Sequence, residues 1–220
     1  MIKNDDYAIA VCKNEKAVSD KLGMRAVSLA PHSTATAMEA NSYAVTMGYA
    51  SETAVAEWNS DAIAIAPHST AIAGNQYSNA VTISMCSYAA AFESPAKVAA
   101  IGAESCATAL GDFSDVVAMN AKSKAVTYGK RCCAVTTGFD SLVQARGIES
   151  IAAGLGVNNS AKGVIGSWLV LAEIVYTDFI YHIKDIKAVK VDGKKIRENV
   201  YYVLRNGQFY VDRTHRCKED

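Results

Sequence analysis

Residues 60–86 decide the fold: written nine to a line, they read SDAIAIAPH, STAIAGNQY and SNAVTISMC. Each line begins with serine, has alanine two residues later, and then alternates apolar with small side chains. A search for such periodicity comes before any prediction of strands or helices. The period of nine extends through the chain, where Ala96 and Cys132 alone interrupt a series of serines at 33, 42, 51, 60, 69, 78, 87, 105, 114, 123, 141 and 150.

Further columns follow the same period. Alanine fills 14 of 18 positions in the column that runs from Ala8 to Ala161, and the column two residues later is small throughout. Glycine recurs six residues after the serine, and the segment 30–35 (APHSTA) returns at 66–71, four units later. These columns explain why 35 of the 37 alanines lie in residues 1–161. The repeating unit is therefore Ser-x-Ala-apolar-small-apolar-Gly-x-x.

The alternation within each unit predicts a β-strand, because successive side chains of a strand point to opposite faces. Nine is a poor helical repeat, and the recurring glycine, serine and β-branched residues outweigh the helix propensity of alanine. A short strand and a turn make half a coil of a β-solenoid. We therefore predict an all-β parallel β-solenoid, or β-roll, of about 18 nonapeptide repeats, two per coil, over residues 1–163. About nine coils at about 4.8 Å per coil give a roll roughly 40–45 Å long.

The pattern leaves open which side of the strands lies inside the roll. If bulky residues such as Val45, Met47 and Ile63 fill the interior, the alanine, serine and threonine side chains lie outside. If alanine fills the interior, a wall of Val, Ile and Met faces outward and exceeds what a monomer tolerates. That wall predicts a homo-oligomer, a trimer or a dimer. The unit is similar to the Ser-Val-Ala-Ile-Gly units of trimeric adhesin-head rolls, although their period is not nine.

Residues 164–220 follow a different pattern and form a second predicted domain. Asp192-Gly193 and Asn206-Gly207 are hairpin turn signals. They separate apolar segments that read as four strands of a small β-meander, near 168–175, 183–191, 200–204 and 209–211. The open end of a solenoid exposes strand edges that aggregate, so we expect this domain to cap the roll. A dedicated binding domain is the alternative.

Five C-terminal segments carry a resemblance: 159–163 (NSAKG), 166–173 (GSWLVLAE), 183–185 (IKD), 188–196 (AVKVDGKKI) and 201–209 (YYVLRNGQF). Together they resemble the tail of an uncharacterised family of phage and prophage proteins, which carry short in-register repeats before this tail. The resemblance covers roughly residues 159–213, and this chain has Ser167 where many members have cysteine. It implies a phage context and no catalytic residues.

Composition excludes several classes of protein. Lys+Arg and Asp+Glu are both 22, so neither bulk nucleic-acid binding nor an acidic nucleic-acid mimic is expected. A hydrophobic content of 50% excludes disorder, and no apolar run is long enough for a membrane span. The N-terminal residues lack signal-peptide character, so we expect a cytoplasmic protein, in the host cytoplasm if a phage encodes it. The six cysteines (12, 86, 106, 132, 133 and 217) are then expected to be reduced thiols that act as small apolar residues.

Few residues point to chemistry. His32 and His68 occupy equivalent positions before serines and read as turn residues, two coils apart and too distant to share a metal. Calcium-binding rolls need a recurring Asp that is missing here, and we expect no metal or other cofactor. The candidate ligand site is a cationic, aromatic-edged patch for a phosphate or nucleotide, formed by Lys122, Lys124, Lys130, Arg131, Tyr128 and Phe113. Ordinary solvated turns are the alternative interpretation.

Two functional hypotheses follow. The first is a non-enzymatic phage-associated binding protein, a counter-defence factor that occludes a host defence protein or sequesters a small nucleotide signal. The second is a structural module, such as a trimeric spike, fibre or adhesin-like part of a phage. An enzyme is not expected.

Overall fold

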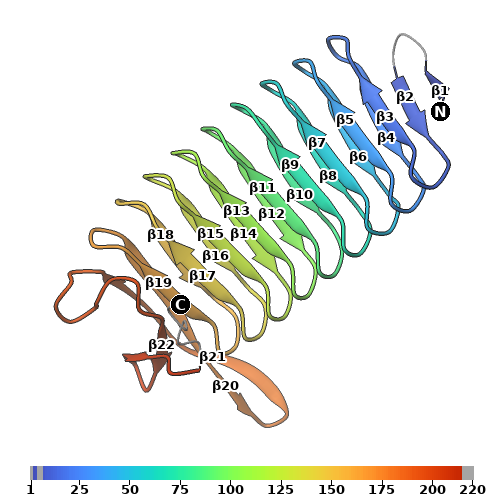
Figure 1. Ribbon diagram of the computed structural model, residues 1–220. Coiled ribbons are helices and arrows are strands. Elements are labelled where there is room, and N and C mark those ends of the chain that lie inside the picture. Colours follow the sequence, from blue (N-terminus) through green and yellow to red (C-terminus); the bar gives the residue numbers. More distant parts are fainter. Residues whose placement is uncertain (1, 4–6, 215–220) are drawn as a thin grey trace.

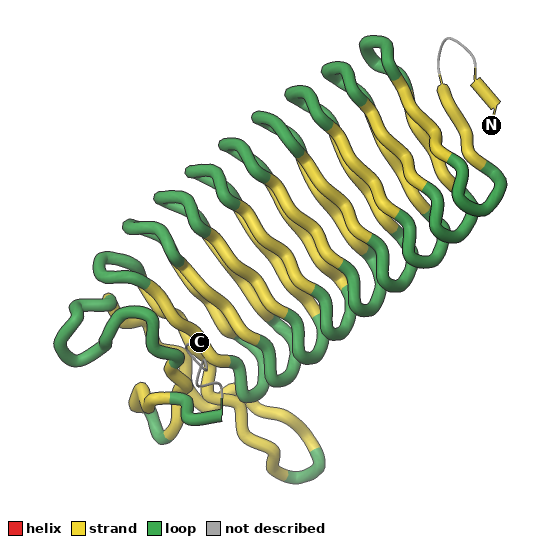
Figure 2. The backbone as a smooth tube through the Cα atoms, in the orientation of Figure 1, coloured by secondary structure: helices red, strands yellow, loops and turns green. Residues whose placement is uncertain are grey.

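The computed structural model describes residues 2, 3 and 7–214, and among these every regular element is a β-strand. The chain winds into a β-solenoid of about nine coils, as the repeat predicts (Figure 1). Each coil contributes one strand to sheet A and one to sheet B, and turns join the two sheets along both edges of the roll (Figure 2).

The two sheets contain the even and the odd repeat strands respectively. In sheet A the order is β1 (Ile2–Lys3), β2 (Tyr7–Ala10), β4 (Arg25–Ser28), β6 (Tyr43–Thr46), β8 (Asp61–Ala64), β10 (Asn79–Thr82), β12 (Lys97–Ile101), β14 (Asp115–Met119), β16 (Cys133–Thr136), β18 (Ile151–Gly154), β20 (Trp168–Thr177) and β21 (Ile180–Lys190). Sheet B runs in the order β3 (Lys16–Ser19), β5 (Thr34–Ala37), β7 (Glu52–Val55), β9 (Thr70–Ala73), β11 (Tyr88–Ala91), β13 (Cys106–Ala109), β15 (Lys124–Thr127), β17 (Leu142–Ala145), β19 (Ser160–Gly163), β22 (Tyr202–Arg205) and β23 (Gln208–Val211).

The repeat strands pair in parallel, each with the strand 18 residues away. Ala80 of β10, for example, lies beside Ala62 of β8 and Val98 of β12. Every column of the sequence therefore becomes a straight row along the roll. Each nine-residue unit thus forms one strand and one turn, and two units form one coil of 18 residues.

The alanine column lies inside the roll. In most repeat strands the second and fourth residues are buried and the first and third are not, and Ala62 and Ala64 of β8 are both 0% exposed. The interior is accordingly a ladder of Ala, Ser, Thr and occasional Val between two closely spaced sheets. This decides the alternative that the sequence left open: the bulky Val, Ile and Met side chains face outward.

The serine column links neighbouring coils at the turns. The hydroxyl of Ser60 accepts a hydrogen bond from the backbone N–H of Ser42 at 3.1 Å and donates to the carbonyl of Glu39 at 3.3 Å. These serines are buried, so each hydroxyl satisfies backbone groups that water does not reach. Cys132 takes the same place in its coil, since its Sγ accepts from the N–H of Ser114 at 3.3 Å. A thiol thus substitutes for the hydroxyl in the ladder.

The turns contain a left-handed residue directly before each serine of the serine column. His32 and His68 have φ of 57° and 58°, which places both histidines in turns as expected. The glycine column serves a different purpose, the close approach of successive coils. A Cβ on Gly147 would lie 1.9 Å from the carbonyl oxygen of Gly129 in the preceding coil. Glycine at this position therefore lets the coil backbones come close.

The four expected C-terminal strands are present, but they form two hairpins instead of one continuous meander. Strand β20 continues sheet A, parallel to β18, and pairs antiparallel with β21. Strands β22 and β23 form the second hairpin, which joins sheet B where Ala161 of β19 pairs with Tyr202. The reason is that both sheets end in an open edge with unpaired backbone groups, and each receives its own hairpin. Residue 164 is therefore a change of sequence pattern within continuous sheets.

Larger side chains fill the capped end of the roll. Leu169, Leu171 and Val191 are fully buried and continue the alanine core, and Tyr202 and Leu204 pack against it. Buried hydrogen bonds between side chains, Gln144 to the Tyr201 hydroxyl and Ser160 to Asp212, hold the second hairpin against sheet B. The cap thus adds the bulky apolar residues that the thin repeat core lacks.

Candidate functional site

The outer face of sheet A is the most extended candidate site. Because alternate residues of a strand share a face, three straight rows of side chains lie on it. The central row contains the third residue of each repeat strand: Ile9, Val27, Val45, Ile63, Val81, Ala99, Val117, Val135 and Ala153. The apolar row contains the fifth residues: Val11, Leu29, Met47, Ile65, Ile83, Ile101, Met119, Thr137 and Leu155. The charged row contains the first residues: Tyr7, Arg25, Tyr43, Asp61, Asn79, Lys97, Asp115, Cys133 and Ile151.

Two of the three rows are apolar along nearly their whole length. The large side chains of the apolar row are between 38% and 51% exposed, with Leu155 and Ile101 at the lower limit and Met47 at the upper. Those of the central row are partly exposed, apart from Ala153, which is 7% exposed. Thr137 interrupts the apolar row once. This is a single continuous apolar surface rather than scattered exposed residues, and such surfaces mark interaction sites.

The outer face of sheet B differs. Its central positions alternate between apolar, small and polar residues: Val18, Thr36, Ala54, Ile72, Ala90, Thr108, Val126, Gln144 and Lys162. Polar side chains thus interrupt the central row of sheet B, although the row of fifth residues on this face exposes Met38, Phe92, Leu110 and Tyr128. The sequence pattern alone treats odd and even repeats as equivalent, but the fold separates them into one continuous apolar face and one mixed face.

A shallow hollow of about 400 Å³ lies in the sheet A face at Ala99. Its apolar walls are the side chains of Ile63, Val81 and Val117, because Ala99 is the smallest residue in this stretch of the central row. The rim comes from the charged row, where Asn79 donates a 2.7 Å hydrogen bond to Asp61 and Lys97 is exposed. The hollow therefore combines an apolar floor with two acidic groups, Asp61 and Asp115, and one basic group, Lys97.

The six residues of the expected cationic patch do not gather in one place. Lys122 and Lys124 lie at the start of β15, and Tyr128 and Lys130 follow its end, so a strand about 13 Å long separates the pairs. Arg131 lies in the same turn as Lys130. Neighbouring acidic side chains already engage two of the cations, since Lys122 lies 4.0 Å from Glu104 and Arg131 donates to Glu149 at 2.7 Å.

The aromatic residues of the expected patch are likewise occupied within the chain. The Arg131 guanidinium lies 5.6 Å from the centre of the Phe113 ring. Arg146 lies 4.8 Å from the centre of the Tyr128 ring. These contacts join side chains of adjacent coils and already engage both aromatic rings of the expected patch.

The two equivalent histidines belong to an aromatic ladder along one edge of the roll. The Tyr49 ring lies 5.9 Å from that of His32 and 5.3 Å from that of His68, both edge to face. Tyr49 thus separates the two imidazoles. Among residues 2, 3 and 7–214, no three His, Cys, Asp or Glu side chains lie close enough together to hold a metal ion.

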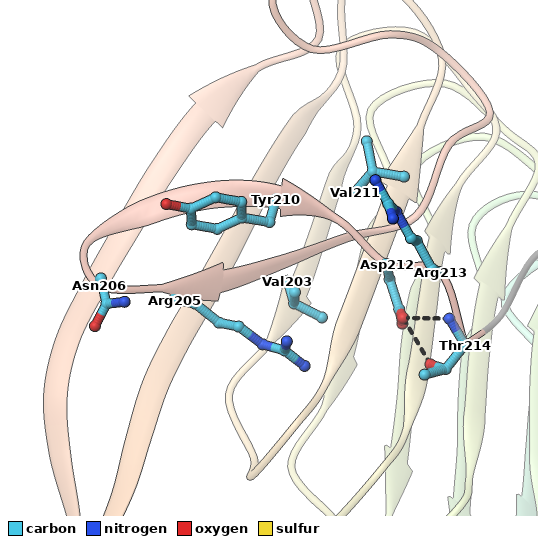
Figure 3. Close-up of a pocket in the computed structure, with 8 residues that line it drawn as sticks. All are labelled: Val203, Arg205, Asn206, Tyr210, Val211, Asp212, Arg213 and Thr214. Atoms are coloured by element: carbon cyan, nitrogen blue, oxygen red, sulfur yellow. Dashed lines mark hydrogen bonds between the residues drawn. The ribbon is translucent and has the colours of Figure 1, made fainter.

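A second hollow, of about 540 Å³, lies on the β22–β23 hairpin (Figure 3). Arg205, Tyr210 and Arg213 line it, and no pattern in the sequence indicated a site there. Asp212 accepts hydrogen bonds from the N–H and the hydroxyl of Thr214 at 2.9 and 2.6 Å. Its carboxylate also bonds to buried Ser160, so we interpret Asp212 as a structural residue of the cap.

The described cysteines 12, 86, 106, 132 and 133 are all free, and Cys217 lies outside the described residues. Burial raises the pKa of the Cys132 and Cys133 thiols, so neither is activated as a nucleophile. In the part of the chain that the structure describes, no helix has the length and apolar character needed to cross a bilayer. Comparison of the chain with family models, with curated proteins and with solved structures gives no match.

Proposed function

We propose that this protein is a non-enzymatic binding and assembly module that self-associates through the outer face of sheet A. The observation that carries the proposal is the pair of apolar rows, which continue from β2 to β18. An exposed apolar surface of this extent is costly in water and gains free energy when a partner covers it. The roll itself serves as a rigid support that holds the rows straight.

A second copy is the partner that fits this face best. The side chains of each row repeat at the spacing of β-strands, about 4.8 Å, and another face with the same spacing can match them residue by residue near the centre of the interface. The nine repeat strands of sheet A, β2 to β18, each present about five residues and form a rectangle of about 38 by 16 Å. Two such faces cover about 1,200 Å² in total, which reaches the lower limit for specific interfaces.

Light scattering on the purified chain tests the proposal. We expect the wild-type protein to have at least twice the monomer mass of 23.4 kDa at micromolar concentration. Ile65→Asp places an unpaired charge in the apolar row and should give monomers. Ile72→Asp, on the outer face of sheet B, is the matched control and should leave the mass unchanged. A wild-type chain that stays monomeric at all concentrations would contradict the proposal.

A second candidate function, a structural module of a phage spike or fibre, is supported by the uninterrupted stack of coils, which makes an elongated body (Figure 1). Its test is the detection of this chain in purified virions by mass spectrometry. A counter-defence role would instead use the sheet A face to occlude a host protein. In that case the chain would be recovered as a monomer bound to one stoichiometric host protein, and Ile65→Asp would abolish this binding. Such a result would identify the host protein, and not a second copy, as the partner.

A further inference from the structure

Large and small side chains of the central row are arranged symmetrically about strand β10. Ile63 lies one strand before Val81, and Ala99 lies one strand after it. Ile9 lies four strands before Val81, and Ala153 lies four strands after it. The remaining members of the row are valines. Each isoleucine is therefore matched by an alanine at the same distance on the other side of β10, which is also the middle strand of β2–β18.

We propose that two copies pack their sheet A faces together about a twofold axis that lies between the two faces, over β10 and parallel to the strands. This inference rests on the proposed self-association and specifies its geometry. The rotation reverses the direction of the roll and keeps each row opposite the same row of the other copy. Ile63 of one copy then enters the hollow at Ala99 of the other, and Ile9 faces Ala153. Val81 faces its own equivalent on the axis.

The charged row supports the same alignment. With β10 opposite β10, Asp61 of each copy faces Lys97 of the other, which gives two equivalent ion pairs beside the axis. Further along the row, Tyr43 faces Asp115, so a phenol hydroxyl meets a carboxylate. Packed sheets lie about 10 Å apart, a gap that a lysine and an aspartate side chain together can bridge. The alignment that matches large with small residues therefore also matches opposite charges.

The apolar row is equally compatible with this axis. Ile83 faces its own equivalent, Ile65 faces Ile101, and Met47 faces Met119. Val11 faces Leu155 at the ends, and Thr137 meets Leu29. Packed twisted sheets cross at about 30°, so contacts near the axis are kept while the ends diverge. The Ile63–Ala99 and Asp61–Lys97 pairs lie one strand from the axis and would therefore determine the alignment of the two faces.

Other arrangements lose these matches. A twofold axis along the roll would place the charged row of one copy opposite the apolar row of the other, and it would bury Asp61 and Lys97 against isoleucines without partners. Moving the axis by half a coil, to lie between β8 and β10, would place Ala99 opposite Val45 and leave a gap. That arrangement would also pair Arg25 with Asp115 in place of Asp61 with Lys97. These two charge pairs thus distinguish the alternatives.

Charge-reversed variants test the register in solution. Asp61→Lys places lysine opposite Lys97, and Lys97→Asp places aspartate opposite Asp61. Each variant alone should dimerise at least about tenfold more weakly than the wild type. Mixing the two variants in equal amounts should restore near-wild-type association, because both pairs in the mixed dimer are again opposite in charge. Thermal unfolding of each variant shows that the loss is not a failure to fold.

Arg25→Asp and Asp115→Arg form the matched control pair. The register centred on β10 predicts that mixing these two variants restores nothing. If the wild type dimerises but mixing rescues only the 25/115 pair, the register is wrong and the proposed self-association stands. Rescue of neither pair also overturns the register. A wild type that is monomeric throughout overturns the proposed function itself, so the two failures are distinguishable.

Discussion

The backbone N–H of Ser51 donates a 3.3 Å hydrogen bond to the hydroxyl of Ser69, 18 residues later, and that hydroxyl donates to the carbonyl of Gly48 at 3.2 Å. One buried side chain therefore serves two backbone groups in the neighbouring coil. The relation recurs from coil to coil, and it explains why serine returns with a period of nine. Any small residue would fit the space, but a hydroxyl is needed to satisfy the buried N–H and C=O.

Ser69→Ala should therefore destabilise the roll. The substitution leaves the Ser51 N–H and the Gly48 carbonyl without this partner in a place that water does not reach. We expect a loss of about 1–3 kcal/mol in the free energy of unfolding, measured by urea denaturation. Ser84→Ala, at a partly exposed turn position, is the matched control and should change stability by less than about 0.5 kcal/mol. Equal effects of the two substitutions would contradict the structural role of the serine column.

The same substitution should have the opposite sign at Ser28. This serine points into the alanine core, is 0% exposed, and its hydroxyl has no hydrogen-bond partner within the described residues. Ser28→Ala removes a desolvated hydroxyl and keeps the packing of Cβ, so stability should rise by about 1 kcal/mol. Urea denaturation checks this prediction. A clear loss of stability would contradict the prediction, because it would mean that the Ser28 hydroxyl makes a stabilising hydrogen bond.

Glu173 makes the attachment of the cap sensitive to acid. Its carboxylate accepts hydrogen bonds from Lys184 Nζ and from the backbone N–H of Gly207, both at 2.8 Å, and these lower the pKa of Glu173 below its ordinary value of 4.5. Because the folded pKa is the lower one, this stabilisation is complete above the ordinary pKa and is lost as pH falls through the folded pKa. The contribution is thus fully present at pH 7.

Glu173→Gln should accordingly lower the melting temperature at pH 7, and the difference from the wild type should shrink as the pH falls below 4.5. Thermal unfolding between pH 3 and pH 7 measures it. Glu198→Gln, at an exposed position, is the control and should follow the wild type at every pH. A difference that stays constant down to pH 3 would exclude ionisation of Glu173 as the cause.

The solenoid, its coil length and its strands could be predicted from the sequence, because the period and the alternation both follow directly from residue order. The sequence pattern left open which face of the repeat strands lies inside the roll, although one feature of the sequence indicates the answer. Arg25, Asp61, Lys97 and Asp115 immediately precede the buried column, and residues at this position share a face with the bulky apolar residues. Charged side chains are rarely buried without partners, so the face that carries them must point outward. The bulky apolar residues share that face and therefore point outward too.

The candidate sites were harder to predict because they depend on which units become neighbours. Residues nine apart, such as Lys122 and Arg131, lie on opposite edges of the roll, and only residues 18 apart stack. The expected cationic patch mixed the two spacings. The pairing of the C-terminal strands was also inaccessible. Asn206-Gly207 does join the paired strands β22 and β23, but the prediction of a hairpin at Asp192-Gly193 was wrong, because that turn lies between β21 and β22, which belong to different sheets, and the β20–β21 hairpin turns at Asp178-Phe179. Turn signals also do not say which sheet each hairpin extends. That choice is made by the open edges of the two sheets.

The most direct test of the central claim, that a second copy covers the sheet A face, uses methionines already present in the chain. Met47 lies in the apolar row and is 51% exposed, and Met38 lies on the outer face of sheet B and is 52% exposed. Hydroxyl-radical footprinting by mass spectrometry compares their oxidation at high and low protein concentration. We predict that Met47 is protected relative to Met38 at high concentration and that dilution removes this protection. Equal oxidation of Met47 and Met38 at every concentration would contradict the account.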